Sequence, residues 1–213
     1  MILNITSKNL VRIDVIDLTL ICHDADGGVK THSLEGIILL DCSNNQLETL
    51  PIFPEGLRLL TCSYNHLRLL SKLPKTLARL NCYNNRLQTL PTLPKTLKML
   101  TCSNNRLQIL PTLPKGLEML SCSDNCLQTL PNLPNRLLEI NCGHNPLVFI
   151  FPLVKRPKYY TVPGNLELLH SSENYSNYSK KYQTFVYLIT YLALHSISPV
   201  LLSNKLFWFP GSF

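Results

Sequence analysis

The sequence lacks the motifs that usually identify an enzyme or a metal-binding protein. No Ser-His-Asp arrangement, phosphate loop or paired-carboxylate cleft can be recognised in its 213 residues. No C-x-x-C pair is present, and the nearest approach to a pair of metal ligands is Cys122 with Cys126 or Cys142 with His144. These absences predict a non-catalytic protein with no cofactor and no metal site.

What the sequence does contain is a strict repeat. Seven of its eight cysteines stand at a fixed interval of 20 residues, and an asparagine follows three residues after each of these except the first. A fixed period of this length predicts a solenoid, in which each cysteine and each asparagine lies beside its copy in the next turn. The cysteines are Cys22, Cys42, Cys62, Cys82, Cys102, Cys122 and Cys142, and the asparagines are Asn45, Asn65, Asn85, Asn105, Asn125 and Asn145.

Six clear units run without insertion from Ile37 to Arg156. The apolar spacing within a unit matches neither a lone helix nor a long strand, which favours one coil per unit. Leu60, Thr61 and Cys62 alternate as in a short strand whose Thr61 faces outward. The remainder of the unit follows the pattern Leu-Pro-x-Leu-Pro in three units, with Pro91 and Pro94, Pro111 and Pro114, and Pro131 and Pro134, and this pattern fixes φ and removes backbone donors, so it favours polyproline II.

The run L-x-x-L-x-C-x-x-N-x-L resembles the conserved segment of leucine-rich repeats, and it is present as LRLLTCSYNHL, LARLNCYNNRL and LKMLTCSNNRL. The 20-residue unit resembles the short class found in bacterial effectors and in giant-virus repeat proteins. This resemblance covers residues 37–156. It implies a leucine-rich repeat solenoid with short parallel β-strands on a concave face and an extended or polyproline II convex face. It also implies a protein partner on the concave face and a host-directed role.

The asparagines and most of the cysteines are interpreted as scaffold. Each asparagine stands where a strand ends, and its amide can satisfy backbone groups of its own and the adjacent turn. The cysteines take an aliphatic position of the resembled family, which favours a buried column that resists alkylation. Cys126 replaces the arginines of neighbouring units and is expected to be exposed and reactive.

The same cysteines bear on the compartment of the protein. An odd number of regularly spaced thiols is a poor disulfide framework. No secretory signal is recognisable in the opening residues MILNITSKNLV. We therefore expect a reducing cytoplasm, which for a viral protein would be the host cytoplasm.

Function in a solenoid is expected on the variable outward positions of the strand face. Tyrosine and methionine are favoured at protein interfaces, so their presence among small hydroxyl and amide groups predicts a protein-binding surface. The alternative is that this sheet face is only hydrated and binds no partner. The predicted partner-binding residues are Leu59, Thr61, Tyr64, Arg79, Asn81, Tyr83, Met99, Thr101, Met119, Ser121 and Asp124. The outward strip is also predicted to include Ser43, Ser63, Ser103 and Ser123.

Basic residues are concentrated after residue 55. Residues 1–55 hold eight acidic and three basic residues, out of 13 and 20 in the chain. A basic stripe could attract nucleic acid, an anionic membrane or an acidic protein, so a basic-surface binder is kept as an alternative function. Aromatic residues are not interleaved with it, which disfavours nucleic acid, and a solvated edge is the simplest interpretation. The predicted stripe comprises Lys75, Lys95, Lys115, Arg86 and Arg106.

Both ends of the repeat array must be covered, because a terminal turn exposes its apolar interior. Residues 1–36 contain the alternating run LVRIDVIDLTLIC, which predicts an N-terminal cap or degenerate repeat with Cys22 in register. Residues 157–213 are expected to form a C-terminal cap or tail with a helical segment. Residues 182–204 carry no Lys, Arg, Asp or Glu, and are either a buried cap helix or a membrane span.

The sequence leaves the identity of the partner and the oligomeric state open. A third alternative is an eroded member of an expanded repeat family, without a specific function.

Overall fold

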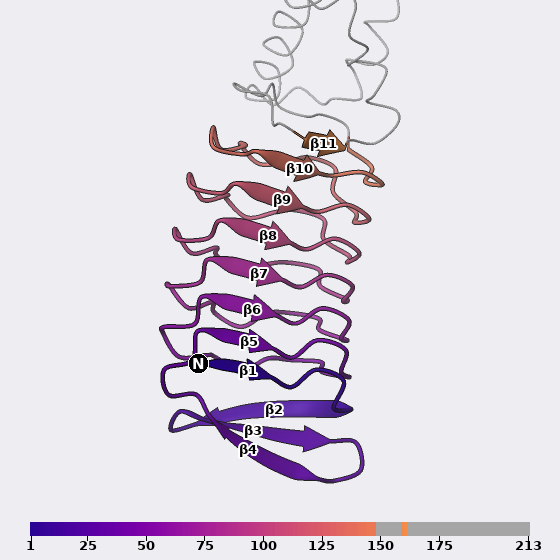
Figure 1. The fold of residues 1–213 in the computed structure, drawn as a ribbon. Coiled ribbons are helices and arrows are strands. Elements are labelled where there is room, and N and C mark those ends of the chain that lie inside the picture. The colour runs from indigo at the N-terminus through magenta and orange to yellow at the C-terminus, as the bar shows by residue number, and fades with distance from the viewer. Residues whose placement is uncertain (148–158, 162–213) are drawn as a thin grey trace, which may run out of the picture. The chain divides into compact units, whose positions relative to one another are not determined.

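The computed structural model describes residues 1–147 and 159–161, most of which form a stack of parallel turns. Figure 1 shows one short strand per turn, all running in the same direction. The eight strands of this parallel sheet, in spatial order, are β1 (Ile2–Asn4), β5 (Leu39–Asp41), β6 (Leu59–Thr61), β7 (Arg79–Asn81), β8 (Met99–Thr101), β9 (Met119–Ser121), β10 (Glu139–Asn141) and β11 (Tyr159–Thr161). The solenoid predicted from the repeat is therefore confirmed.

The register of the sheet follows the sequence repeat. From β5 to β11 each strand pairs with residues 20 positions away, so Leu60 lies between Leu40 and Leu80. The middle residue of every described rung from β5 to β10 is buried, whereas its two neighbours are partly or fully exposed. This alternation is the period of a strand with one face on the core. We call the other side of the parallel sheet the strand face.

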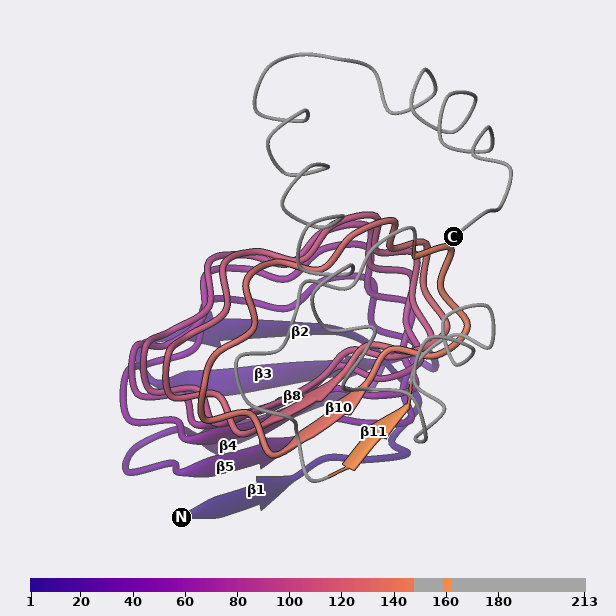
Figure 2. The same ribbon diagram turned by 90° about the horizontal axis from the view of Figure 1, so that it is seen from above.

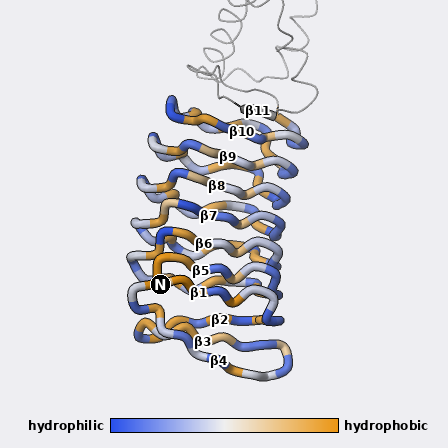
Figure 3. The backbone as a smooth tube through the Cα atoms, in the orientation of Figure 1, coloured by the Kyte–Doolittle hydropathy of each residue, from blue (hydrophilic) through white to orange (hydrophobic). Residues whose placement is uncertain are grey.

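The rest of each turn contains neither helix nor strand within the described residues. Figure 2 looks along the stack and shows successive turns superposed, and Figure 3 shows hydrophobic residues recurring at matching places in each turn. Leu87, Leu90, Leu93 and Leu97 are buried in one such turn. Each buried leucine contributes roughly 1.5–3 kcal/mol, and most of its cover comes from the turns above and below.

A second sheet covers the N-terminal end of this core. It is antiparallel and comprises β2 (Leu10–Ile16), β3 (Thr19–Asp24) and β4 (Val29–Ser33), in that order. Asp17 and Leu18 connect β2 to β3 with φ of 46° and 58°, as a two-residue hairpin with two left-handed residues requires. Ile13 and Leu20 are buried in the same core cluster as Leu40. These strands therefore cap the first turn.

The structure corrects the register predicted for Cys22. Cys22 lies in β3, opposite Ile13 and Lys30 in the antiparallel sheet, and not on a rung of the solenoid. The first rung is β1, where Leu3 pairs with Leu40 and the Ile5 amide donates to Asp41 O at 2.8 Å. Ile5 thus occupies the position that Cys42 has in the next turn. The physical reason is that the strand containing Cys22 is twice the length of a rung and pairs with its sequence neighbours.

The parallel ladder extends beyond residue 156, because β11 pairs with β10 in the same 20-residue register. The remaining residues of the predicted C-terminal region lie outside the described part of the chain. The segment 182–204 is among them, so its two interpretations stay predictions. Residues 1–147 and 159–161 include no helix long and apolar enough to cross a bilayer.

Candidate functional site

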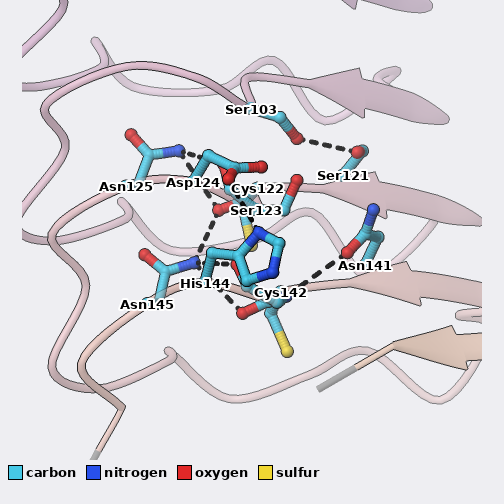
Figure 4. A network of polar contacts seen from close by, with 11 residues as sticks. Ser103, Ser121, Cys122, Ser123, Asp124, Asn125, Asn141, Cys142, His144 and Asn145 are labelled. Atoms are coloured by element: carbon cyan, nitrogen blue, oxygen red, sulfur yellow. Dashed lines mark hydrogen bonds and ion pairs between the residues drawn. The ribbon is translucent and has the colours of Figure 1, made fainter. Parts of the chain in front are cut away.

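The buried asparagines form a ladder that joins each turn to the one before it. The Nδ2 group of Asn125 donates to the carbonyls of Cys102, Cys122 and Ser123 at 3.0–3.1 Å, and its Oδ1 accepts from the Leu107 amide at 3.0 Å. Figure 4 shows Asn125 and Asn145 in equivalent places. Every buried side-chain N and O atom of the described residues has a partner. The interpretation of the asparagines as scaffold is confirmed.

The cysteine column is part of the core. Cys42, Cys62, Cys82, Cys102 and Cys122 are fully buried free thiols. Burial raises the pKa of Cys82 to about 12 and the pKa of Cys22 and Cys142 to about 11, so these thiols are protonated at neutral pH. Cys126 alone is exposed, as predicted.

The strand face brings the predicted partner-binding residues together in rows. At the first strand position Leu59, Arg79, Met99 and Met119 lie side by side, and at the third position Thr61, Asn81, Thr101 and Ser121 do the same. All of these are partly or fully exposed. The strands thus place apolar and polar rows next to each other on one surface.

Tyr64 and Tyr83 form the only aromatic contact found within the described residues. Their ring centroids are 5.3 Å apart and the rings meet edge to face at 70°. Adjacent turns are also joined here by the Tyr64 amide, which donates to Tyr83 O at 2.9 Å. Tyr64 is 48 % exposed, so the pair presents an aromatic surface to solvent.

Tyr64 occupies a backbone position that disfavours large side chains. Its φ is 54°, in the left-handed region, and the equivalent residues of the other turns share this conformation. A non-glycine residue there costs about 1–2 kcal/mol, least for short polar side chains that bond locally. The equivalents are Asn44, Asn84, Asn104, Asp124 and His144. Tyrosine therefore differs from the residue types that the other turns use at this place, and the fold does not require it.

The prediction that the serines following the cysteines belong to the outward strip is wrong. Ser43, Ser63, Ser103 and Ser123 are buried, with at most 8 % exposed. Ser63 Oγ donates to Ser43 Oγ at 3.0 Å, and Ser103 Oγ lies 2.8 Å from Ser121 Oγ. Stacked turns cover this position, because the chain bends there into the solenoid. Tyr83 replaces the serine in its turn and remains partly exposed.

Sequence reasoning missed a further row, which lies one residue before each strand. Arg58 is exposed at this position, and its carbonyl accepts from the Arg79 amide at 3.0 Å. Two turns further along, Lys98 Nζ forms an ion pair with Glu118 Oε1 at 3.0 Å. The 20-residue register could have identified this row, although not its partial exposure.

Comparison with known proteins supports the same architecture. No family model and no curated protein matches the chain. Among solved structures, YopM from Yersinia enterocolitica matches with a TM-score of 0.53 and 36 % identity, over 59 % of this chain and 28 % of that chain. The chain is a leucine-rich repeat solenoid. Its repeats are of the short, 20-residue class.

Two other leucine-rich repeat structures are similar over part of their length. A Shigella effector leucine-rich repeat domain is 38 % identical, with a TM-score of 0.48, over 49 % of this chain and 48 % of that one. YopM from Yersinia pestis is 29 % identical, with a TM-score of 0.48, over 59 % of this chain and 45 % of that one. The match spans less than half of each of these three structures.

The leucine-rich repeat frame also places the predicted basic residues. Lys75, Lys95 and Lys115 are exposed in the turn that precedes each strand, whereas Arg86 and Arg106 are exposed just after the asparagine ladder. The strand separates these two rows. None of the five has an ion pair within the described residues.

Proposed function

We propose that this leucine-rich repeat solenoid is a protein-interaction module that binds its partner on the strand face. The frame residues Leu60, Leu80, Leu100 and Leu120 are identical between turns, while their outward neighbours Leu59, Arg79, Met99 and Met119 vary. Variation restricted to exposed positions of a constant scaffold is how repeat proteins build a specific surface. A cytoplasmic location fits the free thiols from Cys42 to Cys122, and a host-directed role follows from the resemblance to effectors alone.

The observation that carries this proposal is the exposed aromatic pair. Tyr64 and Tyr83 both replace the residue types that other turns use at the same places, and they contact each other. Large rigid aromatic side chains contribute strongly to protein interfaces and lose little conformational entropy on binding. Neither tyrosine has a role in the core that an asparagine or serine could not fill.

The test is affinity capture from cytoplasmic extract with the full chain and two variants. Tyr64→Asn with Tyr83→Ser returns both places to the residues of neighbouring turns, so the fold is kept. Leu69→Thr with Ile109→Thr makes the equivalent change at exposed positions away from the strand face. We expect the first variant to lose a partner that the second retains. Capture of the same partners by both would overturn the proposal.

A second candidate function is binding of nucleic acid or anionic membrane by the two basic rows. The observation in its favour is that Lys75, Lys95 and Lys115 are exposed and without ion pairs in the part of the chain described. Binding of this kind weakens steeply with salt. Repeating the capture at two salt concentrations, with Lys75→Glu, Lys95→Glu and Lys115→Glu together, separates it from the strand-face proposal.

A further inference from the structure

The turns that contain β6 and β7 differ from the rest of the strand face in charge. The main chains of Arg58 and Arg79 are neighbours, since the amide of Arg79 donates to the carbonyl of Arg58 at 3.0 Å. Both are exposed, and neither has an ion pair within the described residues. Elsewhere on this surface Lys98 pairs with Glu118 at 3.0 Å and His144 with Asp124 at 2.8 Å, and the other charged residues at outward strand positions, Asp41 and Glu139, are acidic.

The same two turns hold the aromatic pair at the opposite end of their strands. Arg79, Asn81 and Tyr83 follow one another on the outward side of β7 and the residues just after it. Four residues of extended chain span at most about 13 Å, so this is the upper limit between the Cα atoms of Arg79 and Tyr83. Leu59 and Met99 flank Arg79 on the neighbouring strands.

Two exposed arginines therefore come from neighbouring turns, and the described residues supply neither of them with a carboxylate. A partner that supplies the carboxylate would gain steering and specificity from the pair. Arginine and tyrosine are also the residue types most enriched at the centres of interfaces. Two departures from the repeat, Tyr64 and Tyr83, thus coincide in two adjacent turns with Arg79, the basic residue at the first strand position.

We propose that the partner presents an extended acidic segment to these two turns, a proposal that rests on the strand face being the binding surface. A carboxylate of the segment bonds Arg58 and Arg79, and an apolar side chain three or four residues away packs on Tyr64 and Tyr83. The spacing follows from the limit of about 13 Å and a rise of about 3.3 Å per residue.

The probe for this proposal is a random peptide library displayed on phage, selected on the full chain at physiological salt. We expect selected peptides to contain Asp or Glu three or four residues from an aromatic or aliphatic residue. Their affinity should fall about tenfold or more on Arg58→Gln with Arg79→Gln, and by a similar factor on Tyr64→Asn with Tyr83→Ser. Lys75→Gln with Lys95→Gln removes the same charge elsewhere and should change affinity less than about twofold.

A change in the peptide provides a second arm that does not depend on how a variant folds. Replacing the peptide's Glu by Gln should weaken binding to the parent chain by the same factor as the arginine variant, and should weaken binding to that variant no further. Additive losses would show that the carboxylate binds elsewhere and would overturn the proposal.

The remaining outcomes separate this proposal from the one on which it rests. Selected peptides without acidic residues, which bind the tyrosine variant poorly and the arginine variant normally, would overturn the acidic partner and leave the strand face as the binding surface. Peptides that bind both variants as well as the parent chain would overturn both. Acidic peptides that are lost only with Lys75→Gln and Lys95→Gln would overturn the acidic-segment site and point to the basic rows.

Discussion

At the scale of single residues, two adjacent asparagines in the same turn have opposite roles. Asn105 is buried, and its side chain bonds the carbonyls of Cys82 and Cys102 and the amide of Leu87. Asn104 is exposed at φ of 56°, where its side chain makes one bond, to Asn84. The buried residue joins three segments of backbone, whereas the exposed one serves the local conformation.

Asn105→Ala should therefore lower the free energy of unfolding by about 1–3 kcal/mol, because it leaves the buried Leu87 amide without a partner and removes one of the two side-chain donors to the carbonyls of Cys82 and Cys102. Asn104→Gly should change it by less than about 0.5 kcal/mol, since glycine accepts a positive φ without strain. Urea unfolding followed by circular dichroism measures both. Equal losses of unfolding free energy in the two variants would contradict the assignment of Asn105, the ladder residue, as the structural asparagine.

At the scale of elements, β1 is the first rung and not a loose end. Ile5 follows it at 3 % exposed, in the place of the next turn's Cys42, while Ile2 within it is 72 % exposed. The Asn45 Oδ1 atom accepts from the amides of Lys8 and Leu10, so the ladder ends on this segment. Residues 2–10 thus contribute half a turn of solenoid before the antiparallel cap begins.

Ile5→Ala should lower the free energy of unfolding by about 2–4 kcal/mol, as expected for a buried isoleucine. Ile2→Ala is the matched control on the same element and should lie within about 0.5 kcal/mol of the parent chain. Thermal or urea unfolding distinguishes them. If Ile5→Ala were as mild as Ile2→Ala, the first rung would not be part of the cooperative core.

The rungs from β5 to β10 could be predicted from sequence because each appears in several copies, so that a buried position is marked by its recurrence. The cap has no copies. Cys22 stands 20 residues before Cys42 but does not lie on a rung of the solenoid. Only the hydrogen bonds of the structure show that Ile5 occupies the equivalent place on the first rung. The buried serines were mispredicted for a related reason. An alternating pattern separates the two sides of a strand, but it does not report how closely the next turn covers a residue such as Ser103.

The backbone contact between Arg58 and Arg79 also could not be predicted from the sequence. Both arginines can be located in the repeat, but they stand at places one residue apart within it. The sequence therefore does not show that their backbones bond directly. Their lack of carboxylate partners depends on which acidic residues the fold brings near. The sequence predicts the rows of the strand face, and the structure is needed to identify the two turns where charge and aromatic surface coincide.

At the scale of the whole described solenoid, the seven buried thiols from Cys22 to Cys142 should make the folded state less stable at alkaline pH. Burial raises the pKa of each one, to about 12 for Cys82, whereas an unfolded chain ionises its thiols near pH 8.5. Above that pH the unfolded chain releases protons that the folded chain retains. The stabilisation is therefore complete below about pH 8.5 and is lost as the pH rises toward 11 or 12.

We expect the urea midpoint, measured with reductant present, to fall steeply between about pH 8.5 and 10.5. Each thiol that ionises only in the unfolded chain contributes up to about 1.4 kcal/mol per pH unit. Cys82→Ala should be less stable at pH 7 because it leaves a cavity, yet its stability should fall less steeply with pH by up to that amount. Cys126→Ser, at the exposed thiol, should keep the parent's slope. An unchanged slope in Cys82→Ala would mean that this thiol ionises in the folded state and that the column is open to solvent.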